Sequence, residues 1–293
     1  MNISEFQGHL KASGLKALCG AENTVWVSHE RFSMLRLPAC ALNVPAKEEI
    51  ARIFRECHPA MLSYAVTPSP ERPTNAILYL CSDPDYSIEK LEKSVRYDVR
   101  RGMKQFEIRF LEQDEVLRLG KQAYCDTLAR TGLSVAHREA FEHAFARKRG
   151  ERRYLGTIRD GRLAAFLQLV AVNDWVSIGG YSADEFLSFC PNNALICHAV
   201  RYCLAEKKAR VVDYGFSSIQ AVSNADGLHR FKVRMGFEAV PIHRVFSVNP
   251  MLKPFVNRVS AALVNGMLRL SPRHPVLKKA EGALRMAMEG SNG

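Results

Sequence analysis

The stretch of residues 154–182 constrains the fold of this chain more than any other feature of its sequence. It consists of three apolar runs, YLGTIR, RLAAFLQLVAV and VSIGGYS, separated by turn signals at Asp160-Gly161 and at Asp174-Trp175. Two apolar runs joined by a two-residue Asp-Gly turn are the typical pattern of a β-hairpin. The sequence therefore predicts three consecutive antiparallel strands, at residues 154–159, 162–172 and 176–182.

Helices and short strands are expected on both sides of this β-rich stretch. A predicted helix at 191–208 opens at a proline, which is favoured in the first helical turn. After it we expect a buried strand at 211–215, a helix at 228–235 that Gly236 ends, and a strand at 237–248. On the N-terminal side the predicted order is a helix at 87–106, a strand at 107–110 and helices at 114–131 and 138–149.

These elements predict a central domain at residues 86–249 with a shorter segment on either side. Residues 1–85 are expected to form a smaller N-terminal α/β lobe, which we interpret as a truncated half of the same kind of fold. Its predicted elements are β-type alternation at 24–38, a helix at 47–57 and strands at 61–66 and 76–81. Residues 250–293 carry a surplus of Lys and Arg over Glu and form a basic tail.

Composition places the chain among folded proteins with anionic partners. The chain is 47% apolar and 24% charged, which excludes a disordered chain, collagen and a coiled-coil rod. Its net charge of +11 favours nucleic acid, phosphorylated metabolites or an anionic membrane surface as partners. Eight cysteines without a C-x-x-C pair, no signal-peptide pattern and no apolar run of about 18 residues together predict a cytoplasmic protein.

Three stretches follow one another in the predicted central domain: SVRYDVRRGMKQFEIRFL at 94–111, the strands and Pro-led helix of 156–200, and ARVVDYG with GLHRFKVRMGF at 209–237. Together they resemble the GNAT superfamily of acyltransferases, and more closely its Fem-type branch, which includes the aminoacyl transferases of peptidoglycan cross-bridges. The resemblance implies an α+β, GNAT-like acyl-CoA N-acyltransferase fold, in which helices flank a mixed, mostly antiparallel sheet. It also implies a cleft where two parallel strands, 176–182 and 211–215, separate.

The resemblance implies an enzyme that moves an acyl group to an amine of a cell-envelope or polysaccharide precursor. An acyl-CoA thioester, such as acetyl-CoA, is the simpler donor for a single transferase domain. Aminoacyl-tRNA is the alternative donor, with a peptidoglycan precursor as acceptor, and the charge of +11 favours it because tRNA is a polyanion. A non-catalytic module that binds RNA or membrane is a third interpretation, because residues 186–193 lack the glycines of the superfamily's coenzyme A loop.

Two groups of residues are candidates for binding the donor or its phosphates. Asn192 and Asn193 lie at the start of the helix predicted at 191–208, whose unpaired N–H groups and positive dipole end can hold a pyrophosphate. The alternative role of these asparagines is helix capping. A cationic face of the helix predicted at 87–106 attracts phosphates, or is simply solvated. The members of this face that we select are Arg100, Arg101 and Lys104.

Lys232 is the first candidate for catalysis. The resemblance implies that the matching lysine of Fem-type enzymes lies in the acceptor cleft and stabilises charge during transfer. Attack of an amine on an activated carbonyl builds an oxyanion, and a fixed cation lowers that barrier. The lysine can instead hold an acceptor phosphate, or belong to an exposed helix face together with Arg230 and Arg234.

Asp213 and Tyr214, at the end of the strand predicted at 211–215, are the other catalytic candidates. Tyr214 can protonate a leaving thiolate or ribose oxygen, and Asp213 can accept the amine proton. Equally, the tyrosine can be a core residue and the aspartate can cap the following turn. We select four acceptor-binding candidates nearby, Ser217, Ser218, His229 and Arg230. No metal-ligand spacing occurs among the His and Cys residues, so we expect no metal site.

The basic tail contains an amphipathic pattern. Apolar residues recur at helical spacing at positions 255, 259, 263, 267 and 270, among cations at 253, 258, 269 and 273. One interpretation is a C-terminal helix that packs on the transferase domain. The other is an interfacial helix that makes a peripheral contact with the inner face of the membrane, where lipid-linked envelope precursors reside.

Overall fold

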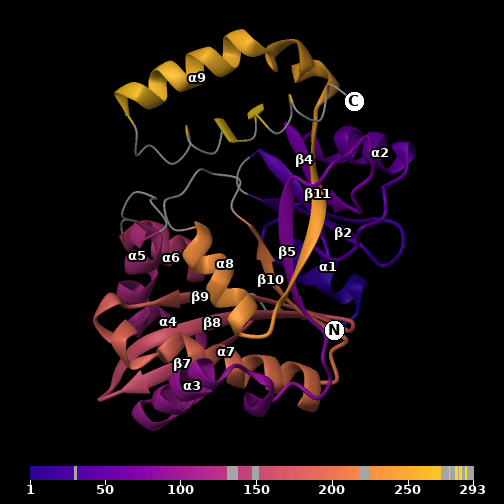
Figure 1. Cartoon of the computed structure of the whole chain (residues 1–293). Coiled ribbons are helices and arrows are strands. Elements are labelled where there is room, and N and C mark those ends of the chain that lie inside the picture. Colours follow the sequence, from indigo (N-terminus) through magenta and orange to yellow (C-terminus); the bar gives the residue numbers. More distant parts are fainter. Residues whose placement is uncertain are drawn as a thin grey trace. The chain divides into compact units, whose positions relative to one another are not determined.

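The computed structural model describes two compact parts of the chain (Figure 1). The central part consists of Met1, Tyr79–Gly215 and Val222–Ala239, and the terminal part consists of Asn2–Leu78, Phe216–Ala221 and Val240–Gly293. The described residues are all except 30–31, 131–137, 147–151, 218–224, 272–276, 278–280, 283, 286–287 and 289–293. Each part is therefore assembled from segments that lie far apart in the sequence.

The sheet of the central part contains the three strands that the hairpin pattern predicts. Its order is β6 (Glu107–Leu111), β7 (Arg152–Arg159), β8 (Arg162–Val172), β9 (Trp175–Ser182) and β10 (Val211–Phe216). Neighbours pair antiparallel, except β9 and β10, which pair parallel. Asp160 and Gly161 both have positive φ, 52° and 72°, which is the backbone that a tight hairpin turn requires. The predicted hairpin is thus confirmed.

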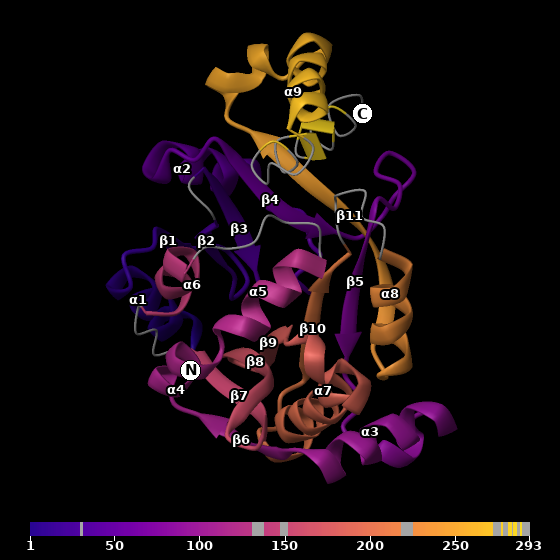
Figure 2. The ribbon, with the colours of Figure 1, turned by 90° about the vertical axis from the view of Figure 1, so that its left-hand side faces the viewer.

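Helices flank this sheet (Figures 1 and 2). They are α3 (Lys93–Gln105), α4 (Gln113–Leu119), α5 (Lys121–Arg130), α6 (Arg138–Phe145), α7 (Pro191–Arg201) and α8 (Ala225–Arg234). Phe141 and Phe145 of α6 pack with Phe166 of β8 in an aromatic core. α3 packs against the start of α7. Gly102 allows this close approach, since a Cβ at that position would lie 2.5 Å from the Cys190 carbonyl oxygen.

Three predicted helices are shorter than the sequence pattern indicates. The helix expected at 114–131 is two helices, α4 and α5, which meet at Gly120. The helix expected at 87–106 begins only at Lys93, after a 3-10 turn at Ile88–Lys90, because Leu91 has an extended backbone. Of the helix expected at 191–208, only Pro191–Arg201 is α-helical, and a π-helical turn, Tyr202–Glu206, follows it. A 3-10 turn at Asp184–Phe189 precedes α7.

The terminal part has its own strands and helices. Its strand order is β1 (Ala17–Cys19), β2 (Val25–His29), β3 (Ser33–Leu37), β4 (Met61–Val66) and β11 (Glu238–Val248). β3 and β4 pair parallel, and β11 pairs antiparallel with β4, with Phe246 opposite Ser63. Its helices include α1 (Ile3–Ala12) and α2 (Lys47–Cys57), and β5 (Ala76–Cys81) runs from this part into the central one.

The core of the terminal part lies under α2. Ile53 of α2 packs with Trp26, Leu62, Tyr64 and Val66 of the strands, all of them buried. The partly buried Val245 of β11 packs against the same cluster, so a strand from the end of the chain completes a core that is otherwise made by the first 66 residues.

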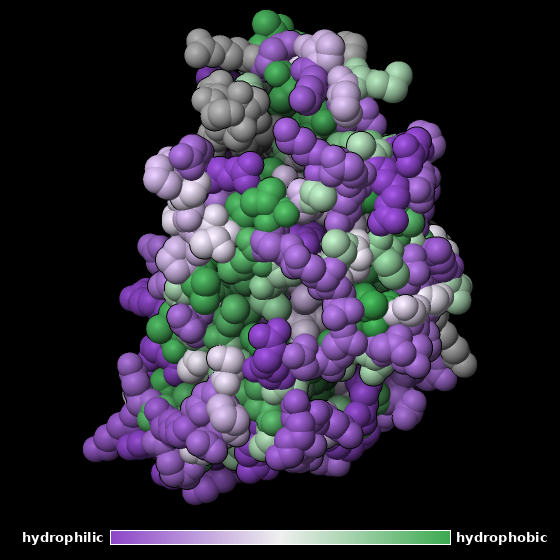
Figure 3. Space-filling model, turned by 90° about the vertical axis from the view of Figure 1, so that its right-hand side faces the viewer, coloured by the Kyte–Doolittle hydropathy of each residue, from purple (hydrophilic) through white to green (hydrophobic). Residues whose placement is uncertain are grey.

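After β11 the chain forms a 3-10 turn, Pro250–Phe255, and the helix α9, Arg258–Leu270. The large apolar residues Val259, Leu263, Met267 and Leu270 are exposed by 69, 65, 52 and 87%. Figure 3 shows hydrophobic and hydrophilic side chains next to one another on this segment, at the top of the view. These four side chains are therefore exposed on the helix itself, and packing of this helix on the transferase domain stays a prediction.

Candidate active site

The two parallel strands of the central sheet separate after a short stretch of pairing. β9 and β10 pair only from Trp175 opposite Val211 to Ser177 opposite Asp213. β9 then continues to Ser182 and β10 to Phe216, and these described residues form no further pairs with each other. A Cβ on Gly179 of β9 would meet no atom within 4 Å, so open space lies beside this strand. Unpaired strand edges of this kind leave backbone donors and acceptors for a ligand.

Lys232 of α8 lies next to the end of β10. Its side chain is buried, and its Nζ donates a hydrogen bond of 2.7 Å to the Tyr214 carbonyl oxygen. The same nitrogen lies 4.2 Å from the ring centroid of Tyr79 and 4.7 Å from that of Tyr214. Burial lowers the pKa of Lys232 to about 8, while the nearby Asp213 carboxylate opposes this shift. The interpretation of Lys232 as an exposed helix residue is therefore wrong.

Tyr214 presents its hydroxyl to the separating strands. A Cβ on Gly180 of β9 would lie 3.6 Å from the Tyr214 hydroxyl oxygen, so the ring reaches toward the neighbouring strand. The ring packs on Phe237, with 5.3 Å between centroids, and burial raises the pKa of Tyr214. No described residue forms a hydrogen bond with this hydroxyl, whose donor and acceptor capacity is available to a bound molecule.

Asp213 is a buried carboxylate with structural partners. Its Oδ1 accepts a hydrogen bond of 2.7 Å from the Gly215 amide, and its Oδ2 accepts one of 2.7 Å from the Trp175 indole. Gly215 has a φ of +71°, which favours glycine at this turn. Burial raises the pKa of Asp213. The geometry agrees with the interpretation of Asp213 as the cap of the turn after β10, and its role as acceptor of the amine proton stays a prediction.

Tyr79 and His229 form a pair beside Lys232. The Tyr79 hydroxyl lies 3.0 Å from Nδ1 of His229, and the two rings are 5.8 Å apart. Tyr79 is buried, which raises its pKa, whereas His229 is half-buried on α8. A lysine between two tyrosines, with an imidazole in hydrogen-bond contact with one of them, forms a short chain of titratable groups at the end of β10.

The start of α7 keeps its backbone donors. Cys190, the residue before the helix, has a left-handed backbone with φ of 61°, and no side chain caps the first turn. The side-chain Nδ2 of Asn192 donates to the Ser182 hydroxyl at 3.0 Å, and the side-chain Nδ2 of Asn193 donates to the Met235 sulfur at 3.7 Å. The interpretation of these asparagines as caps is therefore wrong, and the first-turn N–H groups have no side-chain partner among the described residues.

Arg130 of α5 fixes the end of β9. One terminal nitrogen donates to the Ser182 carbonyl oxygen at 3.0 Å and to its hydroxyl at 2.8 Å, and the other pairs with Asp184. Thr127 accepts a hydrogen bond of 2.8 Å from the Ser182 amide. Since Ser182 also binds Asn192, this network ties the end of β9 to the start of α7.

The basic face of α3 is exposed and only partly paired. Arg100, Arg101 and Lys104 are all exposed, and Arg100 lies 3.7 Å from Glu89. Burial and the Asp98 carboxylate raise the pKa of the Cys190 thiol, and Arg101 lowers it. This face therefore adjoins the start of α7, where an anion would meet the helix N–H groups and Arg101, with Asp98 nearby.

The remaining acceptor candidates lie in different surroundings. Ser217 belongs to the terminal part, where its hydroxyl accepts a hydrogen bond of 2.9 Å from the Ile77 amide. Arg230 is exposed on α8 and contacts the Asp226 carbonyl oxygen at 3.4 Å. Ser218 lies outside the described residues. Of the described acceptor candidates, only His229 contacts the group around Lys232.

Sequence analysis missed three residues that shape the site. Tyr79 lies within the strand predicted at 76–81, and no motif marks it. Arg130 lies within a predicted helix, and its contacts are more than 50 residues away. Cys190 takes a backbone that usually favours glycine, and the Cys-Pro step before an expected helix was the one signal for a turn there.

Comparison with solved structures identifies the fold. The structure of FemX has a TM-score of 0.57 and 11% identity, and the match covers 86% of this chain and 98% of FemX. The C-terminal domain of a putative lysylphosphatidylglycerol synthetase from Agrobacterium fabrum has a TM-score of 0.52 and 11% identity, over 91% of this chain and 96% of that one. L-PGS from Bacillus licheniformis has a TM-score of 0.50 and 10% identity, over 86% and 92%.

The chain thus has the α+β, GNAT-like fold that the Fem-type resemblance implies, and this expectation is confirmed. No family model matches the sequence, and no curated protein matches it either. Among the described residues, no group of three or more His, Cys, Asp or Glu side chains is placed to hold a metal ion. No described helix is long and apolar enough to cross a membrane.

Proposed function

We propose that the protein is an N-acyltransferase whose reaction takes place where β9 and β10 separate. The observation that carries this proposal is the placement of Lys232 and Tyr214 at that point. A buried ammonium can stabilise the oxyanion, and a tyrosine hydroxyl with no hydrogen-bond partner among the described residues can protonate the leaving group; acyl transfer needs both.

The proposed reaction joins an amine to the carbonyl carbon of a thioester. Attack by the neutral amine forms the C–N bond and moves the carbonyl electron pair to oxygen, where the Lys232 ammonium stabilises the negative charge. Collapse of this intermediate breaks the C–S bond and expels the thiolate. Tyr214 gives its proton to the thiolate, and the proton lost by the amine returns to the tyrosine through solvent. Asp213 positions the turn next to Tyr214, through its bonds to Gly215 and Trp175, and the Tyr214 carbonyl oxygen accepts the hydrogen bond of Lys232.

We favour a coenzyme A thioester, such as acetyl-CoA, as the donor. The uncapped start of α7 and the neighbouring Arg101 offer a place for its phosphates, with Arg100 and Lys104 on the same basic face. Aminoacyl-tRNA is the second candidate, and the net charge of +11 supports it. For the acceptor we propose an amine on a cell-envelope or sugar precursor, as the Fem-type resemblance implies.

Thermal unfolding of the full chain with each partner distinguishes these candidates. Stabilisation by coenzyme A and acetyl-CoA supports the acyl-CoA enzyme, and stabilisation by aminoacylated but not by deacylated tRNA supports the second donor. Stabilisation only by unrelated RNA or anionic vesicles supports the non-catalytic module instead and contradicts the proposed function.

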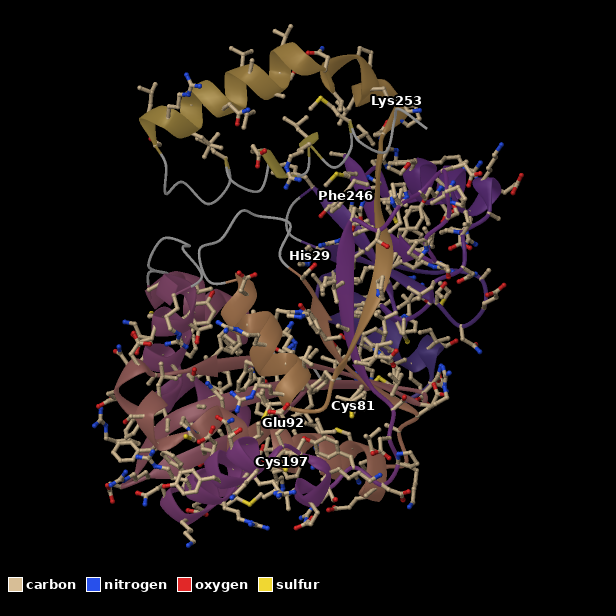
Figure 4. All side chains as sticks on the ribbon, viewed as in Figure 1. His29, Cys81, Glu92, Cys197, Phe246 and Lys253 are labelled. Carbon is tan, nitrogen blue, oxygen red and sulfur yellow. The ribbon has the colours of Figure 1, made fainter. Side chains whose placement is uncertain are left out.

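We also propose a peripheral membrane contact through α9, which would keep the enzyme at the inner face of the membrane. The helix exposes four large apolar side chains, and the exposed Arg269 and Lys253 (Figure 4) are the neighbouring cations. Residues 250–270 contain no Asp or Glu. A helix with an exposed apolar face, cations and no acids complements an anionic lipid surface.

A further inference from the structure

Arg244 of β11 lies in the terminal part without an acidic partner. It is half-buried, and no described carboxylate forms an ion pair with it. Desolvation alone lowers its pKa to about 10, with no contribution from a nearby charge. Arg36 of the same part is different, because Glu49 and Glu22 act on it electrostatically. A half-buried guanidinium with no acidic partner among the described residues has donors left for a ligand from outside the chain.

Two aromatic rings hold the Arg244 side chain. Its guanidinium carbon lies 4.7 Å from the ring centroid of Phe216 and 4.9 Å from that of Phe246, which Figure 4 labels on β11. The Asn75 side chain fixes the backbone, since its Oδ1 accepts from the Arg244 amide at 2.7 Å and its Nδ2 donates to the carbonyl oxygen at 3.0 Å. An arginine held in this way loses little further freedom when it binds an anion.

Arg244 and Ser63 use only some of their hydrogen-bond donors within the described residues. Nε of Arg244 donates to the Ser63 hydroxyl oxygen at 3.2 Å, and this is the one side-chain hydrogen bond of the guanidinium among the described residues. The two terminal nitrogens remain available. The Ser63 hydroxyl accepts that bond and forms no other with a described residue, so its own hydrogen is also available, although Ser63 is only 5% exposed.

We propose that Arg244 and Ser63 form a binding site for the phosphate group of a ligand. The unused donor groups are the two terminal nitrogens of Arg244 and the hydroxyl of Ser63. These three groups match the three oxygens of a terminal phosphate, whereas a carboxylate offers only two oxygens. The planar guanidinium takes two of these oxygens side by side, and the hydroxyl takes the third. This site lies in the terminal part and does not depend on the acyl transfer proposed for β9 and β10.

The test compares Arg244→Met, Arg244→Lys and Ser63→Ala in the full chain, with inorganic phosphate and pyrophosphate as probes. We expect both anions to raise the unfolding temperature of the wild type, and Arg244→Met to weaken their binding about tenfold or more. Arg244→Lys keeps the charge but not the paired donors and should bind at an intermediate level. Arg55→Met, an exposed arginine on α2, is the matched control and should bind like the wild type.

The stability of the variants without ligand separates this proposal from a structural role. A residue kept for a ligand is dispensable in its absence, so Arg244→Met should unfold at the same urea concentration as the wild type or at a higher one. A strong loss of stability in Arg244→Met, or equal phosphate binding by the wild type and all variants, would overturn the site. Stronger stabilisation by malonate than by phosphate, at equal ionic strength, would contradict the phosphate assignment.

Discussion

Lys232 is buried between Tyr79 and Tyr214, so we expect its replacement to lower activity without lowering stability. Lys232→Met removes the cation that we propose for the oxyanion, so turnover should fall about 100-fold or more. The same change removes the desolvation cost of a buried charge, so the unfolding midpoint should stay equal or rise. Turnover is measured as coenzyme A release from acetyl-CoA, and stability by urea unfolding.

A control on the same helix makes the result specific. Arg234→Met removes an exposed cation from α8 and should change neither quantity by more than a small amount. If Lys232→Met keeps wild-type turnover, Lys232 is not part of the active site. If it unfolds the protein instead, the lysine is structural.

The pKa of Lys232 predicts how activity and stability change with pH. The proposed cation is lost as pH rises through about 8, so turnover should decline above that pH. Between about 8 and the ordinary value of 10.5, the unfolded chain binds more protons at this residue than the folded chain. Stability from this group therefore rises with pH across that interval.

Both profiles can be measured on one pair of proteins. Urea midpoints at pH 7 to 11 should show a smaller rise in Lys232→Met than in the wild type. An increase of wild-type turnover above pH 8 would indicate a neutral amine acting as a base, and would contradict the oxyanion role.

At this scale the sequence selected Lys232 as a candidate but did not predict the residues around it. The Phe-Lys-x-x-x-Gly pattern selected Lys232, while Arg230 and Arg234 beside it made an exposed face equally reasonable. Its burial depends on Tyr79, which is 153 residues away in the chain and carries no local signal. The sequence predicts Asp213 and Tyr214 together as catalytic candidates. The contacts with Trp175 and Gly215 show that the Asp213 carboxylate caps a turn, whereas no described residue binds the Tyr214 hydroxyl.

At the scale of elements, α9 gives the sharpest expectation. Full-length protein should sediment with vesicles that contain anionic lipid and stay in solution with neutral ones, because the helix combines exposed apolar residues with cations. Added salt should release it, since each cation near the surface contributes on the order of 1 kcal/mol.

The matched variant replaces Leu263 and Met267 with Ser, which removes the apolar face and keeps every charge. It should remain folded, because both side chains are more than half exposed, and it should lose vesicle binding. Equal sedimentation of the variant and the wild type would show that charge alone, or another surface, is responsible.

The order of strands and helices could be predicted because turn residues and periodicity are local. The Asp160-Gly161 hairpin and the start of α7 at Pro191 are examples. Helix ends were harder, because Gly120 interrupts a continuous apolar pattern. α1 was missed, although Asn2 and Glu5 form a capping box that is visible in the sequence.

For the whole molecule, the pairing of β4 with β11 makes a prediction about fragments. A protein of residues 1–85 contains every element expected for the N-terminal lobe, but it lacks β11, which pairs with β4 from Met61 to Val66. It also lacks Val245, which packs against the core under α2. We expect this fragment to be unfolded, with poorly dispersed amide signals in NMR spectra.

Addition of the missing strand should reverse this. A fusion of residues 1–85 to residues 238–256 through a flexible linker should gain dispersed amide signals, while a fusion with a scrambled 238–256 sequence should not. A folded fragment of residues 1–85 alone would show that the lobe is autonomous and that β11 is an addition to a finished sheet.

The same strand affects how a gene of this kind can be rearranged. β11 is encoded more than 150 codons after β4. A single recombination event that transfers the first 85 codons therefore moves β4 to a new gene without the β11 strand that pairs with its edge. Transfer of the last third of the gene has the reverse effect. Chimaeras of two such genes are therefore expected to survive mainly when both ends come from one parent and only the middle is exchanged.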